Sequence, residues 1–175
     1  MSEVHEMNAE NIVELAMKTE TDAIDFYGKA ALKTQNPVGK KMFLSIVEDE
    51  KRHLEILKCI FSGMDMDIPE VSPMKKIRTV FEENRDLMLG RVAATADETD
   101  ALQIAMGMEK ESVDFYEKAA SQAKSAREKT IFEMLVKEEE EHYAIFSNTY
   151  QFLVDSGNWF MWEEHSAVDG GTPWA

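Results

Sequence analysis

Apolar residues recur at steps of three and four along most of the chain, and this spacing predicts long amphipathic α-helices. The first helix is predicted from about residue 8 to residue 34. Its apolar stripe consists of Ile12, Leu15, Ala16, Ala23, Tyr27 and Ala30. One acidic residue, Glu20, falls on this stripe and interrupts it.

A second helix follows after the short segment Q-N-P-V-G at 35–39. Asn36 is suited to cap it, and Pro37 suits its first position, where no N–H partner is required. The helix should end at Gly63. Because so few residues link the first two helices, they should form an antiparallel hairpin. The second apolar stripe consists of Phe43, Val47, Leu54, Leu57 and Phe61, and it is interrupted by Glu50.

Residues 64–96 break this regular pattern. Pro69 and Pro73 mark a connecting segment, and a shorter helix is predicted after them, from about residue 74 to residue 89. The segment is too long for a tight turn. It is therefore expected to cross from one end of the molecule to the other.

Two more long helices are predicted over 97–123 and 125–155. Thr95 and Glu98 have the spacing of a capping box before the first of them, and Ser125 and Glu128 have it before the second. Together the elements predict an all-α fold, a four-helix bundle of two hairpins joined by one long crossover.

The bundle is expected to occupy residues 1–157, followed by a short C-terminal tail over 158–175. The tail contains Trp159, Trp162 and Trp174. Exposed tryptophan is unfavourable in water, so the tail is predicted to dock on the bundle or on a neighbouring subunit.

The acidic residues that interrupt the stripes belong to an internal repeat. Segments 20–57 and 109–146, offset by 89 residues, align without a gap and share 13 identities in 38 positions. Such a repeat marks two copies of one structural unit. Each copy carries a Glu on one helix and a Glu-x-x-His on the next: Glu20, Glu50 and His53 in the first, Glu109, Glu139 and His142 in the second.

This arrangement predicts a metal site. Positions three apart on a helix share a face, so two facing units bring together four carboxylates and two imidazoles, the ligand set of a dinuclear carboxylate centre. Four buried carboxylates repel one another, and two divalent cations would neutralise them. Oxygen and imidazole ligands suit iron or manganese, with zinc as a competitor. Without metal, burial and mutual repulsion are expected to raise the carboxylate pKa values.

Two further acids are candidates for support of the histidines. Asp49 lies four residues before His53, and Glu138 lies four residues before His142. Each is expected to reach back along its own helix to the imidazole, since ligating histidines usually donate their second N–H to a carboxylate. The alternative is ordinary surface charge.

Tyr27 and Tyr116 are candidate catalytic residues, seven positions after Glu20 and Glu109. They can hydrogen-bond a ligand carboxylate or supply an electron, and core packing is the alternative. The acidic run at 137–142 is expected to be mostly a solvated face, with Glu139 as the exception that the repeat singles out.

The net charge of the chain excludes some classes of binding partner. A formal net charge of −15 argues against nucleic acid and anionic membranes, which need a basic surface. The N-terminus lacks the pattern of a signal peptide, and no apolar run is long enough to span a bilayer. The chain is therefore expected to be cytoplasmic.

The repeated motif E-x-x-x-x-D-F-Y-x-K-A-A followed by E-x-x-H, with a tryptophan-bearing tail that ends in D-G-G, resembles the rubrerythrin-like branch of the ferritin-like superfamily. The resemblance extends from about residue 8 to residue 171. It implies a ferritin-like bundle with two iron ions per chain, held by the six repeated residues, in which the middle Glu of each unit can bridge. It also implies an oxidoreductase, a peroxidase that reduces hydrogen peroxide, with dioxygen as an alternative oxidant.

The chain departs from full-length rubrerythrins in two ways. With Cys59 as its one cysteine it lacks the rubredoxin domain, so electrons should come from a separate donor such as a rubredoxin-type protein. Ser112 stands where rubrerythrins have an extra carboxylate, and the site is thus similar to the symmetric six-ligand form shared with bacterioferritin. Two other functions remain open: iron oxidation for storage, and metal binding without turnover. A single tryptophan-rich docking surface favours a homodimer over a shell.

Overall fold

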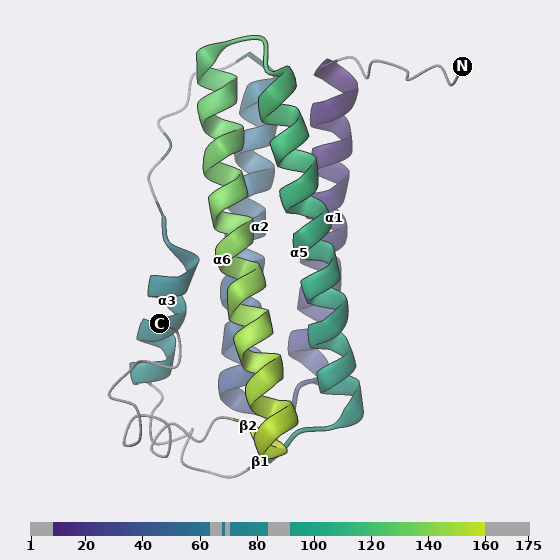
Figure 1. The fold of residues 1–175 in the computed structure, drawn as a ribbon, viewed down its shortest axis with the longest axis vertical. Helices are drawn as coiled ribbons and strands as arrows, with labels where there is room; N and C mark the ends of the chain where they lie inside the picture. Colours follow the sequence, from purple (N-terminus) through teal and green to yellow (C-terminus); the bar gives the residue numbers. More distant parts are fainter. Residues whose placement is uncertain (1–8, 64–67, 69–70, 84–91, 160–175) are drawn as a thin grey trace, which may run out of the picture.

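Four long helices form the body of the protein (Figure 1). The computed structural model describes residues 9–63, 68, 71–83 and 92–159. Helices α1 (Ala9–Lys33) and α2 (Pro37–Phe61) form the first hairpin, and α5 (Ala96–Gln122) and α6 (Ala126–Ser156) form the second. The predicted all-α bundle of two hairpins is confirmed. Among the described helices, none is long and apolar enough to cross a membrane.

The start of α2 follows the local signals in the sequence. The Asn36 side chain accepts hydrogen bonds from the backbone N–H groups of Val38, at 2.8 Å, and Gly39, at 3.0 Å, and Pro37 occupies the first turn. These bonds satisfy two of the N–H groups that a helix start leaves without a partner. At the other end, Gly63 takes the left-handed conformation with a φ of 64°, and the helix stops two residues earlier.

The two predicted capping boxes differ in the structure. Thr95 and Glu98 form a complete box, in which each side chain bonds the backbone of the other residue. Ser125 accepts from the backbone N–H of Glu128, but the Glu128 carboxylate accepts from the backbone N–H of Lys124, at 2.9 Å. Only half of the second box therefore forms, although α6 still starts where expected.

Helix α3 (Pro73–Glu83), in the crossover, lies along one side of the bundle (Figure 1). It packs against α2 and α6 and buries Ile77 in the core. Residues 84–91, where this helix was predicted to end, lie outside the described residues. Strand β1 (Val92–Ala93) pairs antiparallel with β2 (Asn158–Trp159), which joins the end of the crossover to the end of α6. Residues 160–175, most of the predicted tail, also lie outside the described part.

The apolar core is divided into two clusters by a polar layer. One cluster is built around Tyr27, Phe43 and Phe146, and the other around Leu57, Tyr116 and Leu135. On every long helix the break between the clusters falls at the repeated acidic position. The bundle therefore has apolar packing at both ends and holds the candidate metal ligands in its middle.

The predicted stripes are wrong at several positions. Leu15 is 41% exposed and Phe61 is 50% exposed, although both were placed on the buried face. On α2, the fully buried residues include Met42, Ile46 and Ile56 instead. These three residues are buried because α2 contacts α1, α3 and α6, so that its buried face is wider than a single stripe.

Candidate metal centre

The structure brings the six repeated residues together in the middle of the bundle. Each long helix contributes: Glu20 from α1, Glu50 and His53 from α2, Glu109 from α5, and Glu139 and His142 from α6. All six side chains are buried, with at most 2% of each residue exposed. We call Glu20 and Glu109 the outer glutamates, and Glu50 and Glu139 the shared glutamates.

The six residues form two overlapping groups, in each of which the ligand atoms lie within 4.8 Å of one another. The His53 half consists of Glu20, His53 and the shared glutamates. The His142 half consists of Glu109, His142 and the same shared glutamates. These carboxylate and imidazole groups could hold one metal ion in each half.

Both halves have nearly the same geometry around the imidazole Nδ1. In the His53 half, Nδ1 lies 3.0 Å from Glu50 Oε2, 3.0 Å from Glu139 Oε1 and 3.8 Å from the outer glutamate's Oε2. In the His142 half, Nδ1 lies 3.2 Å from Glu139 Oε2, 3.2 Å from Glu50 Oε1 and 3.8 Å from the outer glutamate's Oε2. Each shared glutamate thus presents one oxygen to each half, as a bridging carboxylate must.

The residues fit a pair of metal ions. Oε1 of Glu50 and Oε1 of Glu139 are buried and accept no hydrogen bond, which is costly for a carboxylate unless a cation binds it. Ligand atoms around a first-row metal with bonds of about 2 Å lie roughly 3 Å apart, and the observed spacings are close to this. Glutamate oxygens with imidazole nitrogens suit iron, manganese or zinc.

Both predicted tyrosines hydrogen-bond an outer glutamate, and each does so across the bundle. The Tyr27 hydroxyl donates to Glu109 Oε1 at 2.6 Å, and the Tyr116 hydroxyl donates to Glu20 Oε1. Helices α1 and α5 run antiparallel, so a residue two turns after the Glu on one helix meets the Glu of the other. Tyr27 also packs against Phe43 and Phe146, so it both hydrogen-bonds a candidate ligand and belongs to the apolar core. Supply of an electron by either tyrosine stays a prediction.

Asp49 and Glu138 lie beside the histidines, but with exchanged partners. Glu138 Oε2 is 3.1 Å from Nε2 of His53, and Asp49 Oδ2 is 3.7 Å from Nε2 of His142. The expected contact back along the same helix is therefore wrong. Helices α2 and α6 are antiparallel. The Nε2 atom of each imidazole therefore faces the acidic residue on the other helix, Glu138 or Asp49.

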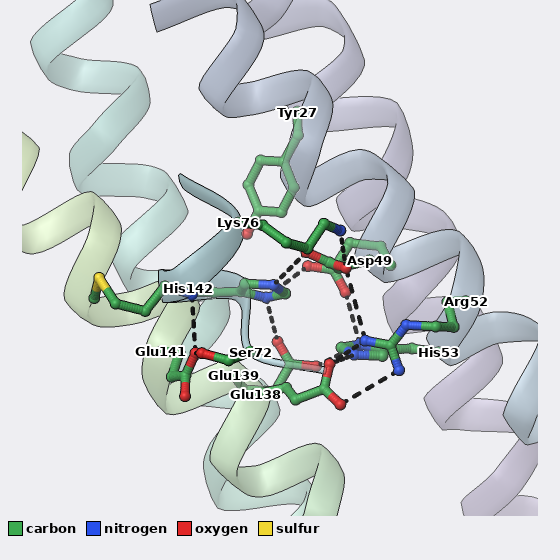
Figure 2. A network of polar contacts seen from close by, with 12 residues as sticks. Tyr27, Asp49, Arg52, His53, Ser72, Lys76, Glu138, Glu139, Glu141 and His142 are labelled. Carbon is green, nitrogen blue, oxygen red and sulfur yellow. Dashed lines mark hydrogen bonds and ion pairs between the residues drawn. The ribbon is translucent and has the colours of Figure 1, made fainter. Parts of the chain in front are cut away.

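Two cations near the site were missed in the sequence. Arg52 bonds both carboxylate oxygens of Glu138, and Lys76 Nζ on α3 lies 2.5 Å from Asp49 Oδ1 (Figure 2). Arg52 could have been noticed because it directly precedes His53 and its repeat equivalent is Glu141. Lys76 lies in the crossover, outside the repeat, and nothing in the sequence distinguishes it.

The acidic run at 137–142 is not mostly solvated. Glu138 is buried, and Glu141 is half-buried, where it accepts hydrogen bonds from Ser72 Oγ at 2.8 Å and from the backbone N–H of Met74 at 2.9 Å. Glu140 is exposed. Because α3 packs over this part of α6, the run faces protein as well as solvent.

Without bound metal, the carboxylates divide into two classes. Burial raises the pKa of the outer glutamates Glu20 and Glu109 well above its usual value, and the negative charges of the shared glutamates raise it further. Burial alone would also raise the pKa of the shared glutamates, but the histidines outweigh it, and their pKa is lowered. The expectation that all four values are raised is therefore wrong for Glu50 and Glu139.

The histidines and tyrosines respond to the same charges. Burial alone would lower the pKa of His53 and His142, yet the surrounding carboxylates raise it well above 6.5. Burial and the outer glutamates raise the pKa of Tyr27 and Tyr116, so both phenols stay neutral hydrogen-bond donors. In the absence of metal, the raised pKa values of the histidines and of the outer glutamates favour the protonated forms of these groups, which reduces the buried negative charge.

Buried carboxylates and imidazoles at the centre of an antiparallel four-helix bundle define a candidate dinuclear metal protein. The sequence model of the Rubrerythrin family matches residues 11–150, and the chain belongs to that family. The predicted family is thereby confirmed. No curated protein matches the chain. A hypothetical protein from Pyrococcus furiosus has a similar fold, with a TM-score of 0.66 and 22% identity over 87% of this chain and 94% of that chain.

Metal content should separate the shared glutamates from their neighbours. Glu50→Ala or Glu139→Ala should remove most of the bound metal, because each deletes oxygens from both halves. Glu20→Ala should leave more, since it removes a ligand from one half alone. Elemental analysis after loading with Fe²⁺ under anaerobic conditions measures this. Glu140→Ala, at an exposed position, is the control. If it lost as much metal as Glu50→Ala, the assignment of the shared glutamates as ligands would be wrong.

The stability of the metal-free protein should depend on pH in a characteristic way. The raised histidine pKa values contribute stability that is complete below 6.5 and is lost as the pH rises through the folded-state values. The raised pKa values of the outer glutamates have the same effect, and their contribution to stability is lost as the pH rises above 4.5. The lowered values of the shared glutamates act oppositely, and their contribution is lost as the pH falls below 4.5.

The free energy of unfolding of the metal-free protein, measured by urea titration, should therefore be greatest near pH 4.5 and should fall as the pH rises, with the histidines adding to the loss above pH 6.5. Saturating metal should move this maximum toward neutral pH, because protons compete with metal for the same atoms. A metal-free protein that becomes more stable above pH 6.5 would show that the assigned pKa directions are incorrect.

Proposed function

We propose that this protein is a non-haem di-iron oxidoreductase that reduces hydrogen peroxide, or dioxygen, with electrons from a separate donor protein. The observation that carries the proposal is the buried pair of ligand groups that share Glu50 and Glu139, in a chain of the rubrerythrin family. Iron is the expected metal, and manganese or zinc could occupy the same ligands.

Two adjacent iron ions, when bound, would supply the two electrons that reduction of hydrogen peroxide to two water molecules takes up, together with two protons. Each shared glutamate would help to hold both ions, because it presents one oxygen to each half. The outer glutamates and the histidines would complete each half. This set would give the two ions the same types of ligand, three carboxylates and one imidazole each.

The tyrosines would orient the outer glutamates. Each phenol O–H binds Oε1 of its glutamate and leaves Oε2 turned toward the imidazole of that half. Because their pKa is raised, the phenols would keep their protons and remain donors. They would thus limit the positions that the outer carboxylates can take when the charge of the centre changes.

The burial of the ligands favours a small oxidant. No ligand residue is more than 2% exposed, and apolar clusters close the bundle on both sides of the site. A bulky organic substrate could not reach these atoms without separating the helices, whereas peroxide and dioxygen are small. The chain holds one cysteine and no Cys-x-x-Cys pair, so we assign the electron supply to another protein.

Stopped-flow oxidation of the anaerobically reduced, iron-loaded protein tests this function. Hydrogen peroxide should oxidise the centre faster than dioxygen, with one peroxide consumed per pair of iron ions, and continued turnover should require an added reductant. Glu140→Ala should behave as the wild type, and Glu139→Ala should lose the reaction along with its metal.

Other outcomes would identify the alternatives. A large closed shell in light scattering, with iron uptake far above two ions per chain, would replace the proposal with iron storage. Iron binding without oxidation by peroxide or dioxygen would indicate a metal-binding protein that does not turn over. We expect a small assembly, consistent with the homodimer predicted from the sequence.

A further inference from the structure

The two halves of the centre differ in the residues that support their histidines. Asp49 and Glu138 are equivalent positions of the internal repeat, as are Arg52 and Glu141. The ligands themselves are identical in the two copies. The repeat has therefore diverged just outside the ligands, in the layer that orients the imidazoles.

Support for the His53 half comes from the bundle alone. Its Nε2 lies 3.1 Å from Glu138 Oε2, within hydrogen-bonding distance. Arg52, on the same helix as His53, bonds both oxygens of Glu138, with 3.3 Å between Nη1 and Oε1 (Figure 2). The Glu138 carboxylate is thus held between an imidazole and a guanidinium, both on α2.

The His142 half lacks this arrangement. Asp49 is one methylene shorter than Glu138, and its Oδ2 stays 3.7 Å from Nε2 of His142, where neither atom has a hydrogen-bond partner. Position 141, equivalent to Arg52, is a glutamate and cannot supply a cation. The nearest cation to Asp49 is Lys76 on α3, 2.5 Å from Oδ1, whereas Arg52 lies 3.7 Å away.

The start of helix α3 is held by Glu141, the residue that is equivalent to Arg52 in the repeat. Glu141 accepts hydrogen bonds from Ser72 Oγ and from the backbone N–H of Met74, in the first turn of α3. One turn on, Ile77 is 1% exposed and packs in the core cluster. Lys76 lies between these two anchors, so the position of its ammonium group depends on the docking of the crossover.

We propose that the two metal positions are inequivalent, and that α3 sets the affinity of the His142 half through Lys76. Lys76 holds Asp49, and Asp49 in turn faces Nε2 of His142, so Lys76 is a positioning residue that touches no ligand. This inference rests on the metal centre of the proposed function. Loss of a group that orients a metal ligand typically weakens binding by about 10- to 100-fold.

Zinc binding tests the inference, because Zn²⁺ has no redox chemistry to complicate the titration. Competition with a chelator should resolve two binding steps in the wild type. Lys76→Ala should weaken one step by about 10-fold or more and leave the other within about twofold. Lys75→Ala, exposed on the same helix, removes the same charge and should match the wild type.

Crystals of the zinc-loaded variants locate the affected step. The anomalous zinc peak beside His142 should be weaker than the peak beside His53 in Lys76→Ala. Arg52→Ala should give the reverse, because it removes the cation that holds Glu138. Far-UV circular dichroism of each metal-free variant checks the fold. If Lys76→Ala does not fold, Lys76→Met keeps an unbranched side chain of similar length, removes the charge and carries the same expectation.

Each remaining outcome overturns the inference in a recognisable way. Equal weakening of both steps in Lys76→Ala would mean that α3 stabilises the bundle without distinguishing the halves. Affinities equal to those of Lys75→Ala would mean that Lys76 does not act on the site. A wild-type protein that binds no zinc would overturn the metal centre, and this inference with it.

Discussion

The burial of four carboxylates in the middle of an apolar bundle is the constraint on which the rest of the structure depends. A carboxylate without a partner is too costly to bury, and four together repel one another. Two imidazoles and two phenols around them offset part of this cost, as do Arg52 and Lys76 one layer further out. The apolar clusters on either side contribute packing that offsets the remaining cost of burying the polar layer. The protein is stable with such a centre because charge and packing are arranged around it together.

Antiparallel packing of equivalent helices explains how so few residues satisfy that constraint. Helices α1 and α5 exchange tyrosine–glutamate hydrogen bonds, and α2 and α6 exchange histidine–carboxylate contacts. Each repeat unit therefore completes the site of the other, and neither unit could bury its own acids alone. The approximate symmetry ends at positions 52 and 141. Arg52 on α2 binds Glu138, whereas the cation that binds Asp49 is Lys76 on the crossover helix α3.

Six candidate ligands could be named from the sequence, because a Glu on an apolar stripe is rare and its recurrence in register is rarer. The structure brings these six side chains together, and their binding of metal stays a prediction. The sequence could not predict which residues touch, since equivalence in a repeat does not say whether a contact runs along a helix or across the bundle. Asp49 and Glu138 were chosen for contacts with the wrong histidines for that reason. Lys76 was missed because a lysine on a short connecting helix looks like any surface charge. Apolar periodicity likewise missed Met42, Ile46 and Ile56, since it gives one stripe where α2 has three neighbours.

Iron-edge anomalous diffraction from crystals loaded with Fe²⁺ tests the central claim most directly. Two iron peaks per chain are expected, one beside Nδ1 of His53 and one beside Nδ1 of His142, with an oxygen of Glu50 and an oxygen of Glu139 bound to each. A single peak, or two peaks that share neither glutamate, would show that the four buried carboxylates are balanced in another way.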